Sequence, residues 1–129
     1  MKKAQARIAK QISFLMFDYE AAKARLTIWD NGIGTVSGVF SRVRGKGYAN
    51  VVMSGLTEYA DKENLELQLE VSRYGYSDTL SPGNEELIKF YSKFGFEVVP
   101  ESGRPVLMTR PKLSDVLGQI IESQESQAL

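Results

Sequence analysis

The chain has 129 residues, of which 43% are hydrophobic and 25% charged, a composition typical of one folded domain rather than of a disordered or fibrous protein. Sixteen Lys and Arg residues balance sixteen Asp and Glu residues, so no global positive field attracts nucleic acid or an anionic membrane surface. The chain contains no cysteine and no histidine, which excludes disulfides, thiolate nucleophiles, the Ser-His-Asp relay and ordinary zinc coordination.

Both ends of the chain are expected to be peripheral to a single domain spanning residues 1–129. Residues 1–11 are basic and residues 112–129 are polar. The basic start turns apolar, but the apolar run stops at Asp18 and no small-residue cleavage site follows it. We therefore expect no secretory signal, no membrane association and a cytoplasmic location.

The first part of the chain predicts strands. ISFLMFDY at residues 12–19 is short, apolar and aromatic, as a buried strand would be, although the spacing of its large residues also permits a helix. Two β-favouring runs, from Leu26 to Trp29 and on to Phe40, flank Asp-Asn-Gly at residues 30–32. These residue types tolerate positive φ in a tight turn, so a hairpin is expected here.

A glycine-rich turn, a helix and a strand are predicted next. The stretch RVRGKGYANVVM, residues 42–53, places two glycines among basic residues, and apolar residues then recur at helical spacing from Ala49 to Asn64. LELQLEV at residues 65–71 alternates apolar and polar positions, as a strand with one buried face does. A right-handed crossover of this kind puts the turn at the carboxyl end of its strand, where open α/β sheets bind ligands.

The glycine-rich turn is suited to an anion. Backbone amides that lead into a helix N-terminus offer hydrogen-bond donors and partial positive charge. Glycine at positions 45 and 47 permits close backbone approach to a phosphate, and Arg42, Arg44 and Lys46 can neutralise its charge. The stretch is neither a P-loop nor the dinucleotide fingerprint, and a tight turn with solvated cations would show the same residue types.

The last part of the chain predicts a helix and two strands. After a loop over residues 72–83, Asn84 stands where a helix N-cap is wanted, and large apolar residues from 87 to 94 form one face. Gly95 fits the left-handed position that ends such a helix. FEVV at residues 96–99 and PVLMTR at residues 105–110 are typical of a final pair of strands.

Two of these segments together resemble the signatures of the GNAT superfamily of N-acetyltransferases. RGKGYA, residues 44–49, resembles the superfamily's pyrophosphate loop, Q/R-x-x-G-x-G/A, with Arg44, Gly47 and Ala49 at its fixed positions. NEELIKFYSKFGFE, residues 84–97, resembles the second signature, approximately N-x-x-A-I-x-L-Y-x-K-x-G-F. The matching positions are Asn84, Ile88, Tyr91, Lys93, Gly95 and Phe96. The resemblance covers residues 33–110.

The resemblance implies a fold and a cofactor. The fold is a mixed α/β (α+β) one: a mostly antiparallel sheet with helices on both faces and a central splay between two parallel strands. The pantetheine arm of acetyl-CoA would lie in that splay, with backbone amides of residues 45–49 on the pyrophosphate and a strand amide near Val39 polarising the thioester carbonyl. The residues implied to bind the cofactor are Val39, Phe40, Arg42, Arg44, Gly45, Lys46, Gly47, Tyr48, Ala49, Asn84 and Tyr91.

The resemblance also implies an activity, transfer of an acetyl group to a primary amine of a small molecule or protein. Direct attack of the amine on the thioester needs no enzyme nucleophile, which suits a chain without cysteine or histidine. Tyr91 is the implied proton donor to the departing thiolate, whereas without the resemblance an aromatic residue on an apolar helix face indicates core packing. The general base is open: Glu70 and Asp78 are candidates, although a solvated surface charge explains either of them better.

Two departures from the superfamily concern the acceptor. The part before the hairpin is short, which leaves little room for the helices that commonly shape the acceptor site, and the loop at residues 72–83 is longer than usual. Tyr74, Tyr76 and Asp78 in this loop are the candidate substrate-binding residues, and a homodimer is one way to complete the site.

Two other functions are alternatives to an acetyltransferase. One is a non-catalytic module that binds CoA or a protein, and the other is a nucleic-acid-binding protein, which the zero net charge disfavours. No metal is expected.

Overall fold

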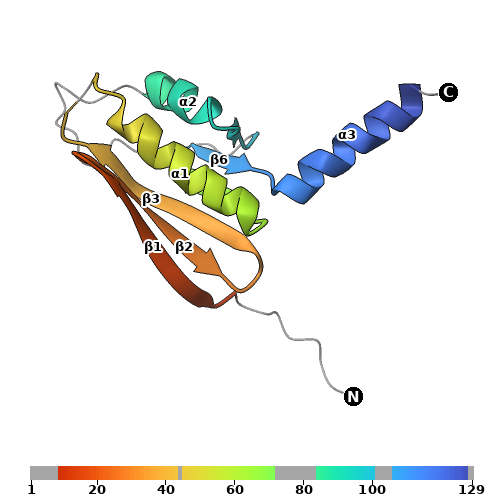
Figure 1. Ribbon diagram of the computed structural model, residues 1–129, viewed down its shortest axis with the longest axis horizontal. Coiled ribbons are helices and arrows are strands. Elements are labelled where there is room, and N and C mark those ends of the chain that lie inside the picture. Colours follow the sequence, from red (N-terminus) through yellow and green to blue (C-terminus); the bar gives the residue numbers. More distant parts are fainter. Residues whose placement is uncertain (1–8, 44, 72–83, 101–105, 128–129) are drawn as a thin grey trace, which may run out of the picture.

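The computed structural model of the chain describes residues 9–43, 45–71, 84–100 and 106–127 (Figure 1). Its elements in chain order are β1 Gln11–Tyr19, β2 Ala22–Trp29, β3 Ile33–Ser41, α1 Tyr48–Lys62, β4 Glu66–Glu70, α2 Asn84–Ser92, β5 Glu97–Val98, β6 Leu107–Arg110 and α3 Leu113–Gln127. The strand predicted at residues 12–19, the hairpin after it and the strand–turn–helix–strand order are confirmed. The burial expected of the first strand is wrong, because Ile12, Phe14 and Met16 of β1 are exposed on the side of the sheet away from the helices.

The strands form one mixed sheet. Its order is β1-β2-β3-β4-β6-β5, and every neighbouring pair is antiparallel except β3 with β4. Because α1 connects β3 to β4 as a crossover helix, these two strands run in the same direction. The predicted α/β fold class, with its mostly antiparallel sheet, is confirmed.

The hydrophobic core lies between the sheet and two helices on the same face. One cluster of buried side chains joins Leu26 of β2, Leu67 of β4, Leu56 of α1 and Leu87 of α2. Figure 1 shows α1 lying across β1, β2 and β3, with α2 beside it over the far half of the sheet. The alternation in β4 explains the pattern, since its leucines face the helices and its polar residues face away.

The second face of the sheet differs from the expectation of helices on both faces. Among the described residues no helix covers it, and Phe14, Met16, Arg25, Gln68 and Glu70 on that side are exposed. Helix amphipathicity in α1 and α2 specifies one buried face per helix, not the side of the sheet against which it packs. Helix α3 extends away from the sheet instead of covering it (Figure 1).

Arg110 joins three elements on the covered face. Its Nε donates a hydrogen bond of 2.6 Å to the carbonyl oxygen of Phe94, after α2, and its two terminal nitrogens donate to the Asp61 carboxylate of α1 at 2.8 and 3.1 Å. The two side chains are 16% and 32% exposed, so water screens the pair only in part. The bidentate geometry fixes β6 against the ends of both helices.

Substitution of Arg110 by methionine tests this link. We expect Arg110→Met to lower the free energy of unfolding by about 2 kcal/mol, because it leaves the Asp61 carboxylate and the Phe94 carbonyl without their shared donor. Urea unfolding measures the change. Lys89→Met, at an exposed position of α2, is the control and should stay within about 0.5 kcal/mol of the parent. Equal effects of the two substitutions would contradict the role given to Arg110.

Candidate functional site

The central feature of the site is a splay between β3 and β4. The two strands pair only from Ile33 opposite Glu66 to Val36 opposite Leu69, although β3 continues to Ser41. Beyond Val36 the remaining part of β3 therefore has no partner in β4. The predicted splay between the two parallel strands is confirmed.

A β-bulge in β3 sets which side chains face the splay. Lys23 of β2 lies opposite Phe40, whereas Arg25, two residues on, lies opposite Ser37, so β3 contains one extra residue at this point. Gly38 within the bulge has φ +60°, a left-handed conformation that glycine adopts without steric cost. The extra residue reverses the alternation, which turns Val39 toward the helices and Phe40 toward the open face.

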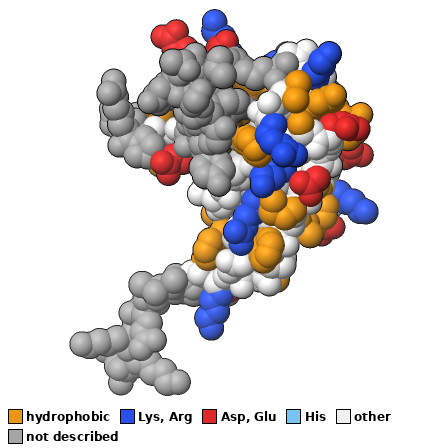
Figure 2. All heavy atoms as spheres, turned by 90° about the vertical axis from the view of Figure 1, so that its left-hand side faces the viewer, with side chains coloured by type: hydrophobic (Ala, Val, Ile, Leu, Met, Phe, Trp, Pro, Cys, Tyr) orange, Lys and Arg blue, Asp and Glu red, His pale blue; other side chains and the backbone are white. Residues whose placement is uncertain are grey.

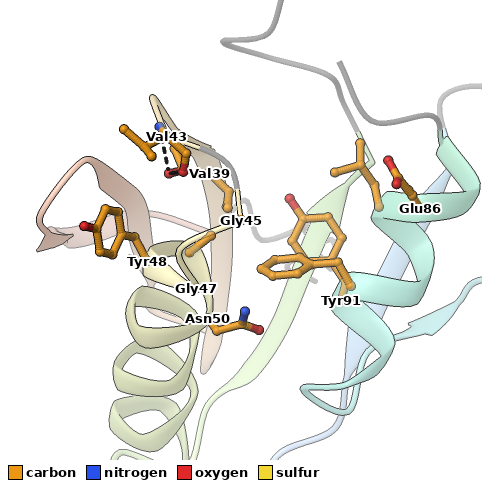
Figure 3. Close-up of a pocket in the computed structure, with 12 residues that line it drawn as sticks. Val39, Val43, Gly45, Gly47, Tyr48, Asn50, Glu86 and Tyr91 are labelled. Carbon is orange, nitrogen blue, oxygen red and sulfur yellow. Dashed lines mark hydrogen bonds between the residues drawn. The ribbon is translucent and has the colours of Figure 1, made fainter. Parts of the chain in front are cut away.

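The splay opens into a cavity of about 530 Å³ on the helix side of the sheet (Figure 3). Its walls come from the end of β3, the glycine-rich turn, the first turn of α1 and one side of α2. The lining residues are Val39, Ser41, Val43, Gly45, Gly47, Tyr48, Ala49, Asn50, Glu86, Leu87, Phe90 and Tyr91. Two sequence segments separated by about forty residues thus meet at one cavity, as the two-signature resemblance implies.

The glycine-rich turn places the N-terminus of α1 at the wall of this cavity. Gly47 is the N-cap of the helix, with φ +74° and no side-chain cap, and Gly45 has φ +80°. The first turn of α1 contains no acidic residue, so nothing in that turn offsets the positive end of the helix dipole. A Cβ at Gly45 would have no protein atom within 4 Å. Backbone conformation, not crowding, is what requires glycine there.

Tyr91 reaches the cavity from α2. Its side chain is 4% exposed and packs edge-to-face between the rings of Phe90, at 5.3 Å between centroids, and Phe96, at 6.0 Å. Figure 3 shows the ring directed from α2 toward the space beside the glycine-rich turn. Packing on two sides fixes the ring, so the phenol has a defined position at the cavity wall.

A direct hydrogen bond links the two helices at the cavity. Lys93 Nζ donates to Asn50 Oδ1 at 2.9 Å, and the same ammonium lies 5.1 Å from the centre of the Phe90 ring. Asn50 is in the first turn of α1, one residue beyond the loop signature, and Lys93 is a matched position of the second signature. The bond connects the first turn of α1 to the residue that follows α2, on the exposed side of the two helices.

Several lining residues were missed by sequence reasoning. They are Ser41, Val43, Asn50, Glu86, Leu87 and Phe90. Helical spacing could have found three of them, because positions 86, 87 and 90 share a side of α2 with Tyr91. Ser41 and Val43 carry no such signal: the Ser41 hydroxyl donates to the Val43 carbonyl at 2.7 Å and shapes the bend after β3.

Some predicted site residues lie away from the cavity. Phe40 and Arg42 line a separate depression on the sheet, with Asp18, Glu20 and Lys23 among its other residues. Lys46 is exposed beside the glycines and does not line the cavity. Glu70 is exposed on the side of β4 opposite the helices, next to the last residue that pairs with β3.

The remaining predicted residues fall partly outside the described part of the chain. Arg44 and the candidate substrate residues Tyr74, Tyr76 and Asp78 lie outside the described residues, and of Asn84 only the backbone, at the start of α2, is described. Within the described ranges no group of three or more Asp or Glu side chains is placed to hold a metal ion. No helix among the described residues has the length and apolar character needed to span a bilayer.

The fold of the chain is similar to the folds of several solved structures, among them proteins described as N-acetyltransferases. The chain is similar to AcrVA5, an anti-CRISPR protein, with a TM-score of 0.62 and 20% identity over 76% of this chain and 98% of that protein. It is also similar to a proposed acyl-CoA N-acyltransferase from Klebsiella pneumoniae, with a TM-score of 0.54 and 18% identity over 72% of this chain. A GNAT-family acetyltransferase from Staphylococcus aureus gives a TM-score of 0.51 and 16% identity over 70% of this chain.

These likenesses establish the fold at low sequence identity. The matched region spans 64% of the Klebsiella protein and 59% of the Staphylococcus protein, less than two thirds of each, but nearly the whole of AcrVA5. No protein-family model and no curated protein matches the sequence.

The left-handed conformation of Gly38 in the bulge leads to a testable prediction. A Cβ at this position would meet no atom within 4 Å, so Gly38→Ala introduces no clash, only the cost of φ +60°. We expect a loss of about 1–2 kcal/mol in the free energy of unfolding, measured by urea denaturation. Ser37→Ala, at the neighbouring exposed position, is the control. A loss no larger than that of the control would show that the left-handed bulge is absent.

Proposed function

We propose that the chain is an acetyl-CoA-dependent N-acetyltransferase acting on a primary amine of a small molecule or a protein. The observation that carries the proposal is the cavity in the β3–β4 splay, onto which the N-terminus of α1 opens through two left-handed glycines. The GNAT-family fold of the neighbours supports the same activity class.

The residues around the cavity fit acetyl-CoA. The backbone amides of residues 45–49 would bind the pyrophosphate, since the first amides of a helix have no partner within it. Lys46, exposed beside the two glycines, and Arg44, the residue before Gly45 in the sequence, would supply positive charge to the pyrophosphate, whereas Arg42 lines the separate depression. Apolar side chains, including Val39 and Phe90, line the cavity further in, where the pantetheine arm would pair with the unpartnered end of β3 as an added strand.

The chain's own residues then have definable tasks. When bound, acetyl-CoA supplies an acetyl thioester, whose carbonyl carbon accepts the amine nitrogen as the CoA thiol leaves. The backbone N–H of Val39, beside the bulge, would donate to the developing negative charge on the carbonyl oxygen. Tyr91, fixed between two aromatic rings, would give its phenolic proton to the leaving sulfur.

The acceptor would approach from the open face of the sheet. The cavity occupies the helix side, and among the described residues no helix covers the other side. A primary amine with a pKa near ~10.4 must lose a proton before it attacks. Glu70 is the proposed base because it is exposed on that face, one residue past the last β3–β4 pair, with Asp78 as the second candidate.

Titration calorimetry with acetyl-CoA tests the cofactor site. We expect micromolar binding, about −8 kcal/mol, and its loss in Gly47→Glu, because a carboxylate at the N-cap would occupy and repel the pyrophosphate position. Gly55→Glu adds the same charge to an exposed position of α1 away from the cavity and should bind as the parent does.

Gly47→Ala separates charge from backbone strain, because it carries the same positive-φ cost without the carboxylate. Binding that is absent in the parent protein, or unchanged in Gly47→Glu, would contradict the proposed cofactor site.

Turnover tests the role of Tyr91. With a panel of primary amines as acceptors, Tyr91→Phe should lower kcat by about 10²-fold while acetyl-CoA affinity stays within twofold. Released CoA thiol can be followed with a thiol reagent without background, because the chain has no cysteine. Tyr59→Phe makes the same change at a ring that packs on Phe17 and should leave kcat unchanged.

Two results would count against the catalytic proposal. An unchanged kcat in Tyr91→Phe would remove Tyr91 from the mechanism. Tight acetyl-CoA binding without turnover of any acceptor would favour the alternative, a non-catalytic CoA-binding module.

A further inference from the structure

The side chain of Asn50 lies between the glycine-rich turn and α2. It belongs to the first turn of α1 and lines the cavity. Its Oδ1 accepts the hydrogen bond from Lys93 Nζ at 2.9 Å, and its Nδ2 lies 4.0 Å from the position that a Cβ would take at Gly47. Figure 3 shows the amide nitrogen directed toward the glycine-rich turn and the amide oxygen toward α2.

The Lys93 ammonium determines which end of this amide faces the turn. An ammonium has three donors and no acceptor, so only the amide oxygen can bind it and the amide nitrogen points away from it. The ammonium is itself held near the rings of Phe90 and Phe94, 5.1 and 5.9 Å from their centres. Without Lys93, a half-turn of the amide would exchange nitrogen and oxygen with little change in shape.

The Nδ2 of Asn50 adds a hydrogen-bond donor to the N-terminus of α1. Within the described part of the chain it donates to no protein group. Helical bonding begins with the Val51 N–H, which donates to the Gly47 carbonyl at 3.2 Å, so the backbone N–H groups of residues 48–50 have no partner inside the helix. Side-chain and backbone donors thus lie at one cavity wall, in a turn without an acidic residue, which favours an anion with several acceptor oxygens.

We propose that Asn50 is a cofactor-binding residue whose Nδ2 donates a hydrogen bond to a pyrophosphate oxygen of acetyl-CoA, and that Lys93 is the positioning residue that orients it. The inference rests on the proposed function, because it needs a phosphate-bearing cofactor at the start of α1. It adds to the backbone amides a side chain that can be changed without altering the backbone. It also gives a task to Lys93, which does not itself line the cavity.

Asn50→Asp tests the assignment because it replaces only the amide NH2 by an oxygen. The carboxylate still accepts from Lys93, but its second oxygen would face the pyrophosphate and repel it. A carboxylate in the first turn also favours a helix, so the free energy of unfolding, measured with urea, should not fall. In titration calorimetry we expect the affinity for acetyl-CoA to fall by about tenfold or more.

Asn31→Asp is the matched control for this change. The side-chain oxygen of Asn31 accepts from the Ile33 N–H in the turn after β2, a role that a carboxylate oxygen can also perform. The residue does not line the cavity. Asn31→Asp should therefore bind acetyl-CoA as the parent protein does.

A double-mutant cycle tests whether Lys93 acts through Asn50. Lys93→Met should lower the affinity for acetyl-CoA by about threefold, whereas Lys93→Arg, which keeps a donor, should retain it. In the Asn50→Ala background, Lys93→Met should cause no further loss. Lys89→Met removes a charge from an exposed position of α2 and should leave the affinity unchanged, which separates loss of the hydrogen bond from loss of a positive charge.

Comparison of CoA with dephospho-CoA identifies the phosphate that Asn50 binds. Dephospho-CoA keeps the pyrophosphate and lacks the phosphate on the ribose. The fold-change in affinity caused by Asn50→Asp should therefore be the same for both ligands.

Four results would overturn the inference in whole or in part. An affinity of Asn50→Asp within twofold of the parent's would remove Asn50 from the cofactor site while leaving the site itself intact. A loss that disappears with dephospho-CoA would place Asn50 at the ribose phosphate instead of the pyrophosphate. Equal losses from Lys93→Met with and without Asn50 would mean that Lys93 acts independently. Absence of acetyl-CoA binding by the parent protein would contradict the proposed function, and this inference with it.

Discussion

The early end of the pairing between β3 and β4 is the constraint on which the rest of the site depends. After Val36 and Leu69 the ladder stops, while β3 continues through a bulge at Gly38 that shifts its register against β2. Backbone groups along Val39–Ser41 on the β4 side are thereby released from the sheet, and polar backbone groups at a cavity wall are satisfied best by a ligand or by water. A ligand with its own amide groups suits this position because it can continue the ladder where β4 leaves off.

The positions of the helices follow from the same arrangement. Helix α1 must cross from the end of β3 to the start of β4, so its N-terminus lies at the open end of the splay and its C-terminus near the paired end. At that far end Arg110 binds Asp61 and the Phe94 carbonyl, and near the cavity Lys93 binds Asn50. Both polar links lie on the face of the sheet that carries α1 and α2. Among the described residues no helix covers the other face of the splay (Figure 2 shows the end of the molecule at which the splay opens).

Helices and strands with a clear hydrophobic periodicity were predictable from the sequence, whereas the way in which they pair and pack was not. The alternation at residues 65–71 and the helical spacing from Ala49 to Asn64 each specify a structure without reference to neighbours. The bulge was not predictable because Ser37-Gly38-Val39-Phe40 alternates plausibly in either register, and only the pairing with β2 decides that Val39 and not Phe40 faces the cavity. The helical spacing of the apolar residues Leu113, Leu117 and Ile120 was visible in the sequence. Because residues 112–129 are polar on average, however, the segment was interpreted only as a peripheral end.

A sheet with one bare face is an incomplete layer architecture, because a sheet is stable when its apolar side chains are covered. On the open face the apolar side chains lie at β1, whereas β4 presents Glu66, Gln68 and Glu70. The exposed apolar side chains and the polar side of β4 therefore lie on different strands of the same face. The splay opens beside the polar side of β4, where Glu70 lies, so a polar acceptor amine would approach it without crossing the apolar side chains of β1.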